Sequence, residues 1–258
     1  MARIAVGQAP FSADVDANVA TARDLRAAAS AEGADLLVLS ELFLSGYRVA
    51  GIDGDRTLTL DDPRLAPLVD DGSPTEVLVG AAVDGPGGRR NAVLRFRAGD
   101  APEVAYAKLH LWESERGPFA AGHDLSVIEV AGLRVGLGVC YDAGFPEFSR
   151  AYAHAGVDLI VFSSAFLIGE EADRYDIYHP ARALESGCFV VVSDAAGSDG
   201  DGRFYGHSRI VDPRGRVRAD LGETGALAWV DVSPADVRAT RSALPYLDHL
   251  LPAYRAHL

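Results

Sequence analysis

Short apolar runs that end at polar residues constrain the fold of this chain most strongly. One run, 135–139, leads directly into Cys140, and another, 36–39, ends just before Glu41. Runs this short and this continuously apolar are typical of strands buried on both faces. A helical pattern separates 135–139 from the next run, 158–162, so this region reads as strand, helix, strand. The pattern predicts an α/β protein with reactive groups at the carboxyl ends of its strands.

The remaining periodicity adds strands and helices on both sides of that unit. Alternating or apolar segments predict further strands at 3–9, 76–83, 91–96, 104–107, 126–130, 189–193, 205–211, 217–221 and 226–232. Helical spacing predicts helices at 15–29, behind the cap candidates Ser12 and Asp14, at 63–69, from Pro146, and at 170–185 with an interruption near Pro180. Periodicity alone fits a doubly wound sheet as well as a layered sandwich.

Length, composition and net charge limit the number of domains and the kinds of partner that this chain can have. The chain has 258 residues, of which 48% are hydrophobic, and this predicts one domain spanning 1–258. A net charge of -13 without any basic run argues against nucleic acid and against a membrane surface. Residues 1–10 read as a strand rather than a signal peptide, which predicts a cytoplasmic protein. Two cysteines predict free thiols, with neither a metal nor a cofactor.

Three ionisable residues stand at predicted strand exits. Cys140 occupies a turn between a strand and a helix, where it could be a reactive thiol or merely a small buried one. Glu41 has an apolar flank in 42–44, a setting that raises the pKa of a carboxyl group. Lys108 also lies among apolar residues, so we expect an acidic partner, for which Glu113 and Glu115 are candidates.

These residues lie in stretches that resemble the nitrilase, or carbon–nitrogen hydrolase, superfamily. Its signature is a Glu-Lys-Cys triad, and the matching stretches are LVLSELFLSGY at 37–47, YAKLHLWESE at 106–115 and GLGVCYDAGFPEFSRAYAHAGVDLIVFSSAF at 136–166. The similarity continues through RALESGCFVVVSDAAG at 182–197 and FYGHSRIVDPRG at 204–215. The resemblance implies a four-layer α-β-β-α sandwich that assembles as a homodimer or larger homo-oligomer. The apolar tail 233–258 is then expected to pack on the body or on a second subunit.

The resemblance also implies a role for each site residue. Cys140 would attack an amide carbon to form a thioester, and Glu41 would act as the base. Lys108 would share the oxyanion with the backbone N–H of Tyr141. Glu115 matches a second family glutamate that orients the lysine or contacts substrate. Residues expected in the oxyanion or substrate-binding region are Tyr141, Asp142, Ser164 and Phe166.

Several reactions remain open within this resemblance. The Cys-Tyr-Asp sequence at 140–142 favours an amidase acting on a small aliphatic or ω-amide, with an N-carbamoyl amidohydrolase or a nitrilase as alternatives. A catalytically silent scaffold that binds a small molecule or a partner through the same pocket is the alternative of another class. Ser186 and Asp194 stand where relatives often have Asn, which bears on specificity.

The remaining motifs do not indicate another catalytic or binding site. The Gly-x-Gly at 136–138 lacks the third glycine of a dinucleotide fingerprint, and neither Gly-x-Ser-x-Gly nor His-Glu-x-x-His occurs. Cys188 is expected to be a packed core thiol. For His110, His179 and His207 we expect hydrogen-bonded structural roles rather than metal ligation.

Overall fold

Two six-stranded sheets form the centre of the part of the chain that the computed structural model describes, which is residues 1–47, 52, 54–69, 72–199 and 202–255. The first sheet runs in the order β14 (Leu227–Val232), β1 (Ala2–Gly7), β2 (Leu36–Val38), β3 (Glu76–Val83), β4 (Arg90–Phe96) and β5 (Glu103–Ala107). The second runs in the order β13 (Val217–Asp220), β12 (Arg209–Val211), β9 (Phe189–Asp194), β8 (Leu159–Ser164), β7 (Leu133–Val139) and β6 (Val127–Val130).

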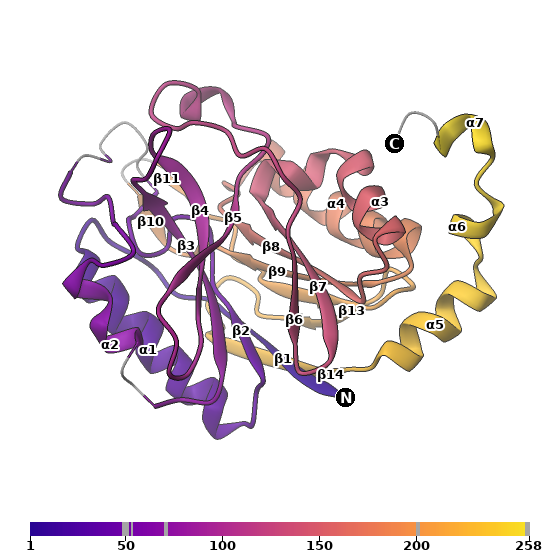
Figure 1. Cartoon of the computed structure of the whole chain (residues 1–258), viewed down its shortest axis with the longest axis horizontal. Helices are drawn as coiled ribbons and strands as arrows, with labels where there is room; N and C mark the ends of the chain where they lie inside the picture. Colours follow the sequence, from indigo (N-terminus) through magenta and orange to yellow (C-terminus); the bar gives the residue numbers. More distant parts are fainter. Residues whose placement is uncertain (48–51, 53, 70–71, 200–201, 256–258) are drawn as a thin grey trace.

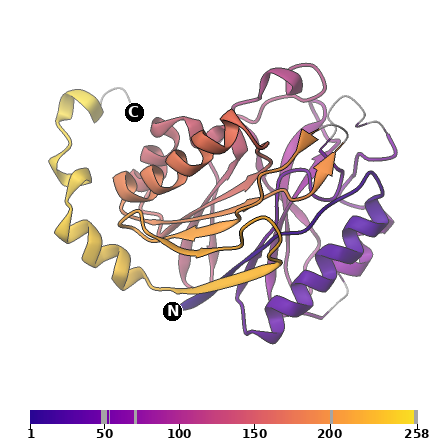
Figure 2. The same cartoon turned by 180° about the vertical axis from the view of Figure 1, so that it is seen from behind.

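Helices cover the outer faces of the two sheets (Figure 1). α1 (Val15–Ala31) and α2 (Ala66–Val69), the latter after the 3-10 turn η2 (Pro63–Leu65), lie on the first sheet, and α3 (Pro146–His154) and α4 (Glu170–Ser186) lie on the second. The reverse view shows the same layers (Figure 2). The expected four-layer α-β-β-α sandwich is confirmed. Among the described residues, no helix is both long and apolar enough to cross a bilayer.

Alternation along the strands explains why two separate apolar cores form. In β1, Ile4 and Val6 join the core between the sheets, whereas Ala5 joins the core beneath α1. The sheets are also joined by hydroxyl groups, since Ser163 Oγ donates to the Leu39 carbonyl oxygen at 2.8 Å. Strands that are buried on both faces therefore need the short apolar runs seen in the sequence.

The Gly-x-Gly of β7 serves packing. A Cβ on Gly136 would lie 2.7 Å from the Tyr152 ring of α3, and a Cβ on Gly138 would lie 2.7 Å from the Phe162 ring of β8. Any side chain at either position would force these rings to move. The two glycines thus set the distance of α3 and β8 from the strand that ends at Cys140.

Two expectations about local structure need correction, and one hairpin has no counterpart in the sequence analysis. α4 continues through Pro180 instead of breaking there. Buried residues on both sides of the proline, Tyr175 and Ala183, pack against the second sheet and offset the missing backbone hydrogen bond. The strand expected at 205–211 is shorter, because only Arg209–Val211 pairs in the sheet. A two-stranded hairpin, β10 (Ser198–Asp199) with β11 (Gly202–Arg203), was not expected.

Only the first part of the C-terminal segment packs on the two-sheet body. α5 (Pro234–Ala243) begins at the cap Ser233 and is fixed by Arg241, whose guanidinium donates to the Val157 carbonyl oxygen at 2.8 Å. α6 (Tyr246–His249) and α7 (Pro252–Arg255) then lie at the periphery, away from the sheets (Figure 1). Residues 256–258 of the predicted tail lie outside the described residues.

Candidate active site

Cys140 lies where β7 ends and the 3-10 turn η4 (Cys140–Gly144) begins. Its φ of 44° lies in the left-handed region, which residues other than glycine rarely adopt. Asp142 stabilises this turn, because its Oδ2 accepts hydrogen bonds from the Val139 N–H at 3.0 Å and from the Tyr106 hydroxyl at 2.8 Å. Backbone strain at the thiol is therefore balanced by a buried carboxylate two residues later.

The other oxygen of Asp142 is occupied as well. Asp142 Oδ1 accepts the backbone N–H of His110 at 3.0 Å and lies 2.7 Å from His110 Nδ1. The His110 ring stacks on Phe145, with ring centroids 3.8 Å apart. Asp142, expected in the oxyanion or substrate-binding region, is thus fully buried and does not line the substrate-sized cavity described below. The expected structural role of His110 agrees with these contacts.

Glu41 follows β2 in a tight turn that crosses β3 at Gly80. A Cβ on Gly80 would lie 2.4 Å from both the Ser40 carbonyl oxygen and the Leu42 nitrogen. The Gly80 N–H donates to that Ser40 oxygen at 3.1 Å, and Leu42 has a φ of 50°. Only glycine lets the turn lie this close to the strand, so Gly80 determines where the Glu41 carboxylate is placed.

A buried network joins Glu41 to Lys108 and Glu115. Lys108 Nζ donates to Glu41 Oε1 at 2.7 Å and lies 2.8 Å from Glu115 Oε2. The Asn91 amide nitrogen donates to Glu41 Oε1 at 2.7 Å and to Glu115 Oε1 at 2.6 Å. Glu115, in the 3-10 turn η3 (Glu113–Glu115), also accepts the Trp112 backbone N–H at 2.6 Å. All three charged side chains are buried, so each is held by several charge-assisted hydrogen bonds.

The second oxygen of Glu41 has a different setting. Glu41 Oε2 is buried and has no hydrogen-bond partner within the part of the chain that the structure describes. Because Oε1 is occupied by Lys108 and Asn91, Oε2 is the oxygen available to accept a proton.

Burial changes the ionisation of the site. Burial raises the pKa of Glu41 to about 7, although Lys108 acts in the opposite direction. Burial alone would lower the pKa of Lys108, but the nearby Glu41, Cys140 and Glu115 raise it above its usual value. Burial and the charge of Glu41 raise the pKa of Cys140 well above its usual range, with Lys108 opposing. The charges of Glu41 and Lys108 both act on the Cys140 thiol, so the ionisation of the thiol depends on both groups.

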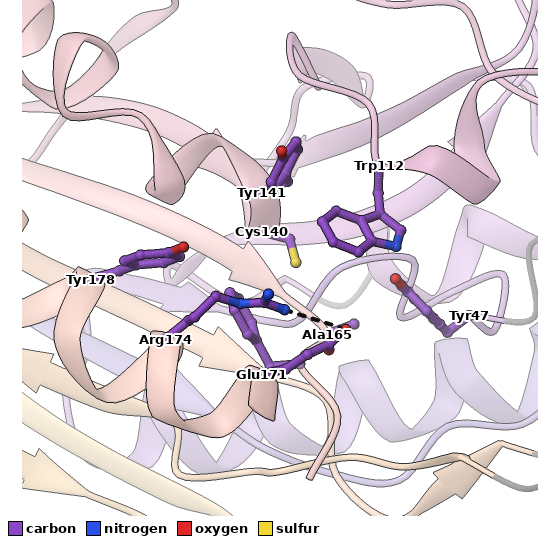
Figure 3. A pocket seen from close by; sticks show the side chains of 9 residues that line it. Tyr47, Trp112, Cys140, Tyr141, Ala165, Glu171, Arg174 and Tyr178 are labelled. Atoms are coloured by element: carbon purple, nitrogen blue, oxygen red, sulfur yellow. Dashed lines mark ion pairs between the residues drawn. The ribbon is translucent and has the colours of Figure 1, made fainter. Parts of the chain in front are cut away.

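A cavity of about 220 Å³ opens over the Cys140 sulfur (Figure 3). The sulfur points into it, and Arg174 reaches toward it from α4. The cavity is mostly aromatic, with one acidic and one basic side chain, and its lining residues are Tyr47, Trp112, Cys140, Tyr141, Ala165, Phe166, Glu171, Arg174 and Tyr178. This volume lies below the range of about 300–1,000 Å³ that is usual for ligand pockets, so the cavity suits only a small molecule.

The predicted site residues fall into distinct positions. Cys140, Tyr141 and Phe166 line the cavity. Ser164 is fully buried and does not line it, although its carbonyl oxygen accepts the Glu41 N–H at 3.4 Å. Glu113 is 78% exposed on its side chain and takes no part in the Lys108 network.

The two positions noted as unusual for the resemblance also lie outside the cavity wall. Asp194 is buried behind it, and its Oδ1 accepts the N–H of Phe166 at 2.8 Å. Ser186 is buried at the end of α4, where its hydroxyl lies 3.4 Å from the Ser149 carbonyl oxygen. Asp194 therefore supports a cavity residue, whereas Ser186 serves helix packing.

Some site residues were not expected from the sequence. The sequence predicts Asn91 only as the start of a strand. A polar amide at the start of an apolar strand is the signal that could have marked it as a buried hydrogen-bond donor. Tyr47 and Trp112 lie in the stretches around Glu41 and Lys108, where nothing singles them out, whereas Glu171, Arg174 and Tyr178 come from a segment with no local motif that marks a cavity. In the described ranges, no group of three or more His, Cys, Asp or Glu side chains is arranged to hold a metal ion.

Comparison with known proteins decides the family. A model of the carbon–nitrogen hydrolase family matches residues 3–242. The chain belongs to that family. An (R)-stereoselective amidase from Pseudomonas sp is 32% identical over 247 residues, which cover 91% of this hydrolase and 86% of that protein.

Further relatives agree with an amidase branch. A 2-oxoglutaramate amidase from Bacillus subtilis (strain 168) is 28% identical over 84% of this hydrolase and 85% of its own length. The solved structure of an amidase from Nesterenkonia sp. AN1, which carries acrylamide added at its active site cysteine, has a TM-score of 0.80 and 28% identity. That similarity covers 95% of this hydrolase and 98% of the amidase. This protein is a thiol-dependent hydrolase of non-peptide carbon–nitrogen bonds.

The two cysteines of this hydrolase should differ in reactivity. Burial raises the pKa of both thiols, but Cys140 faces the cavity whereas Cys188 is fully buried in the core, so the two differ in access. In native protein, iodoacetamide should modify Cys140 at least about tenfold faster than Cys188, as measured by peptide mass spectrometry over time. Glu41→Gln should slow the reaction at Cys140 by removing the base. In urea both thiols should react alike, and equal rates in native protein would contradict this site.

Proposed function

We propose that this hydrolase converts a small aliphatic amide or ω-amide into a carboxylate and ammonia, with Cys140 as nucleophile, Glu41 as base and Lys108 as electrostatic stabiliser. One observation carries the proposal. The buried ammonium of Lys108 contacts both Glu41 and Glu115, and its charge acts on the Cys140 thiol, which lines a small cavity. Such an arrangement combines a nucleophile, a proton acceptor and a fixed positive charge in one site.

Acylation would begin with proton transfer coupled to attack. Because the pKa of Cys140 is raised by burial, the resting group is a neutral thiol that must give its proton to Glu41 Oε2 as sulfur attacks. The carbonyl oxygen becomes an oxyanion, which Lys108 and the backbone N–H of Tyr141 would stabilise. Glu41 then returns the proton to the amide nitrogen, the carbon–nitrogen bond breaks, and ammonia leaves with a thioester on Cys140.

Deacylation would reverse the roles with water as nucleophile. Glu41 takes a proton from water while the water oxygen attacks the thioester carbon. Glu41 then gives that proton to the Cys140 sulfur as the sulfur leaves. Glu115 and Asn91 would act as positioning residues, since both form hydrogen bonds within the Glu41–Lys108 pair's network. The net reaction consumes one water and releases one carboxylic acid and one ammonia.

The alternatives differ in products. An N-carbamoyl substrate would release carbon dioxide along with ammonia, and a nitrile would need two waters to reach the acid. The amide reading is preferred because the named relatives that match over most of this chain are amidases. Measuring ammonia and carbon dioxide released from amide, carbamoyl and nitrile substrates distinguishes the three reactions.

Replacing the nucleophile should abolish turnover. Cys140→Ala removes the atom that forms the thioester, so ammonia release should fall by at least about 10⁴-fold. Cys188→Ala is the matched control, because that thiol is buried in the core away from the cavity and its loss should leave the rate within a few-fold. Ammonia release from short amides is the measurement. Unchanged turnover in Cys140→Ala, with its fold intact, would overturn the assignment.

Activity should fall as pH decreases through about 7. Glu41 accepts a proton only when ionised, and burial raises its pKa to about 7, so kcat/KM should rise tenfold per pH unit below that value and level off above it. Lys108 should remain charged across this range because its pKa is raised. The measurement is the pH profile of kcat/KM between pH 5 and pH 9.

The control for this profile is His110→Gln, because His110 contacts the Asp142 carboxylate rather than the Glu41–Lys108 pair. Its profile should keep the same midpoint, even if the absolute rate changes. A midpoint that disappears in His110→Gln would assign the titration to histidine instead of Glu41.

We also propose that 1–258 forms one hydrolase domain in the cytoplasm and assembles as a homodimer through α4 and the tail. Exposed apolar side chains support this, since Ile177 of α4 is 66% exposed, Leu251 is 60% exposed, and α6 contacts α4. Light scattering after size exclusion should give twice the mass of one chain. Ile177→Glu should shift it to the monomer, whereas Leu60→Glu, at an exposed site near α2, should not. A monomeric wild-type chain would contradict the dimer.

A further inference from the structure

Arg174 is the cationic side chain that the structure places in the wall of the cavity. It projects from the first turns of α4 toward the Cys140 sulfur (Figure 3). Its side chain is 42% exposed, which is more than that of Glu171 beside it, at 28%. A charged side chain that lines the same cavity as the nucleophile would contact the acyl chain of a substrate whose carbonyl carbon the thiol attacks.

The contacts of Arg174 are looser than those of neighbouring arginines. Its Nη2 lies 3.7 Å from Glu171 Oε1, beyond hydrogen-bonding distance, and its guanidinium lies 5.8 Å from the centroid of Trp112. By contrast, Arg182 Nε donates to the Ala143 carbonyl oxygen at 2.8 Å, and Arg209 Nη1 donates to Asp176 at 2.8 Å. The guanidinium groups of Arg182 and Arg209 are therefore used in hydrogen bonds that stabilise the fold. The guanidinium of Arg174 lies near Glu171 and Trp112 without a close hydrogen bond to either.

We propose that Arg174 binds a carboxylate at the end of the substrate remote from the amide, so that the preferred substrates are ω-amides of short dicarboxylic acids. This inference rests on the proposed amidase function. A guanidinium presents two parallel N–H donors that match a carboxylate, and stacking near an aromatic ring holds its plane. The cavity volume of about 220 Å³ limits the acyl chain to a few carbons.

The charges around the cavity favour an anion over a cation at this position. Glu171 is engaged already, since its Oε2 accepts the Leu167 N–H at 2.8 Å and its Oε1 faces Arg174. An ammonium group on the substrate would therefore meet Arg174 before it could use Glu171. A carboxylate would otherwise be repelled by a chain of net charge -13, so a cation inside the cavity is needed to hold it.

The test compares substrates that differ only in charge at the far end. Glutaramate carries a carboxylate, 5-methylhexanamide replaces it with an uncharged isopropyl group of similar shape, and 5-aminopentanamide carries an ammonium. For wild-type enzyme, kcat/KM measured by ammonia release should be at least about tenfold higher with glutaramate than with either of the others.

Arg174→Met should remove this preference selectively. We expect kcat/KM for glutaramate to fall by about 10- to 100-fold, mainly through KM, while that for 5-methylhexanamide changes by less than about threefold. Arg174→Lys should restore part of the lost activity, because it keeps the charge but not the paired donors. Arg23→Met, at a half-exposed arginine of α1 outside the cavity, is the matched control and should change neither substrate.

The outcomes separate this inference from the proposed function. Turnover of all three amides without preference for glutaramate, or an equal loss on both substrates in Arg174→Met, would overturn the role of Arg174 while leaving the amidase intact. A preference for 5-aminopentanamide would assign recognition to Glu171 instead. Failure of the wild-type enzyme to release ammonia from any amide would instead reject the proposed function. The iodoacetamide reactivity of Cys140 in Arg174→Met verifies that the site remains folded.

Discussion

The buried ion pair between Lys108 and two glutamates is the interaction on which the rest of the site depends. A lysine that is 1% exposed on its side chain is tolerated because Glu41 and Glu115 contact it directly. Removing one partner of such a buried pair typically costs about 3–5 kcal/mol, because the remaining charge is left uncompensated. One positive charge faces two carboxyl groups, so the cluster as a whole favours binding one more proton. Burial is the main reason that the pKa of Glu41 is raised to about 7, and the charge of Glu115 adds to it, while the same carboxyl groups keep Lys108 charged.

The backbone holds this cluster in place by strained or tightly packed turns. Cys140 and Leu42 both have positive φ values, and each lies at the start of a turn that follows a buried strand. The turn at Leu42 fits only because Gly80 lacks a side chain, and the turn at Cys140 is secured by the buried carboxylate of Asp142. Strain of this kind persists where the surroundings over-determine the conformation, as two packed sheets do here.

Local patterns in the sequence predicted most of the strands and helices, whereas the four-layer arrangement and the Glu-Lys-Cys triad were implied by the resemblance to the nitrilase superfamily. Short apolar runs mark the buried strands before Glu41 and Cys140, whereas the strand before Lys108 is only partly buried. The hydrogen-bonding role of Asp142 was not predictable, because its donors Tyr106 and His110 lie more than thirty positions earlier. The same holds for Asn91, whose two carboxylate partners come from different loops. Contacts between residues this distant in sequence are set by packing of the two sheets and leave no periodic signal.

The residues proposed for catalysis and the residue proposed for recognition come from different parts of the fold. Glu41, Lys108 and Cys140 follow strands of the two central sheets, whereas Glu171, Arg174 and Tyr178 project from α4 on the outer layer. A substitution on α4 can therefore change the charge of the cavity without disturbing the hydrogen bonds of the Lys108 cluster. Since α4 also carries the exposed Ile177, the same helix joins the cavity wall to an apolar outer surface.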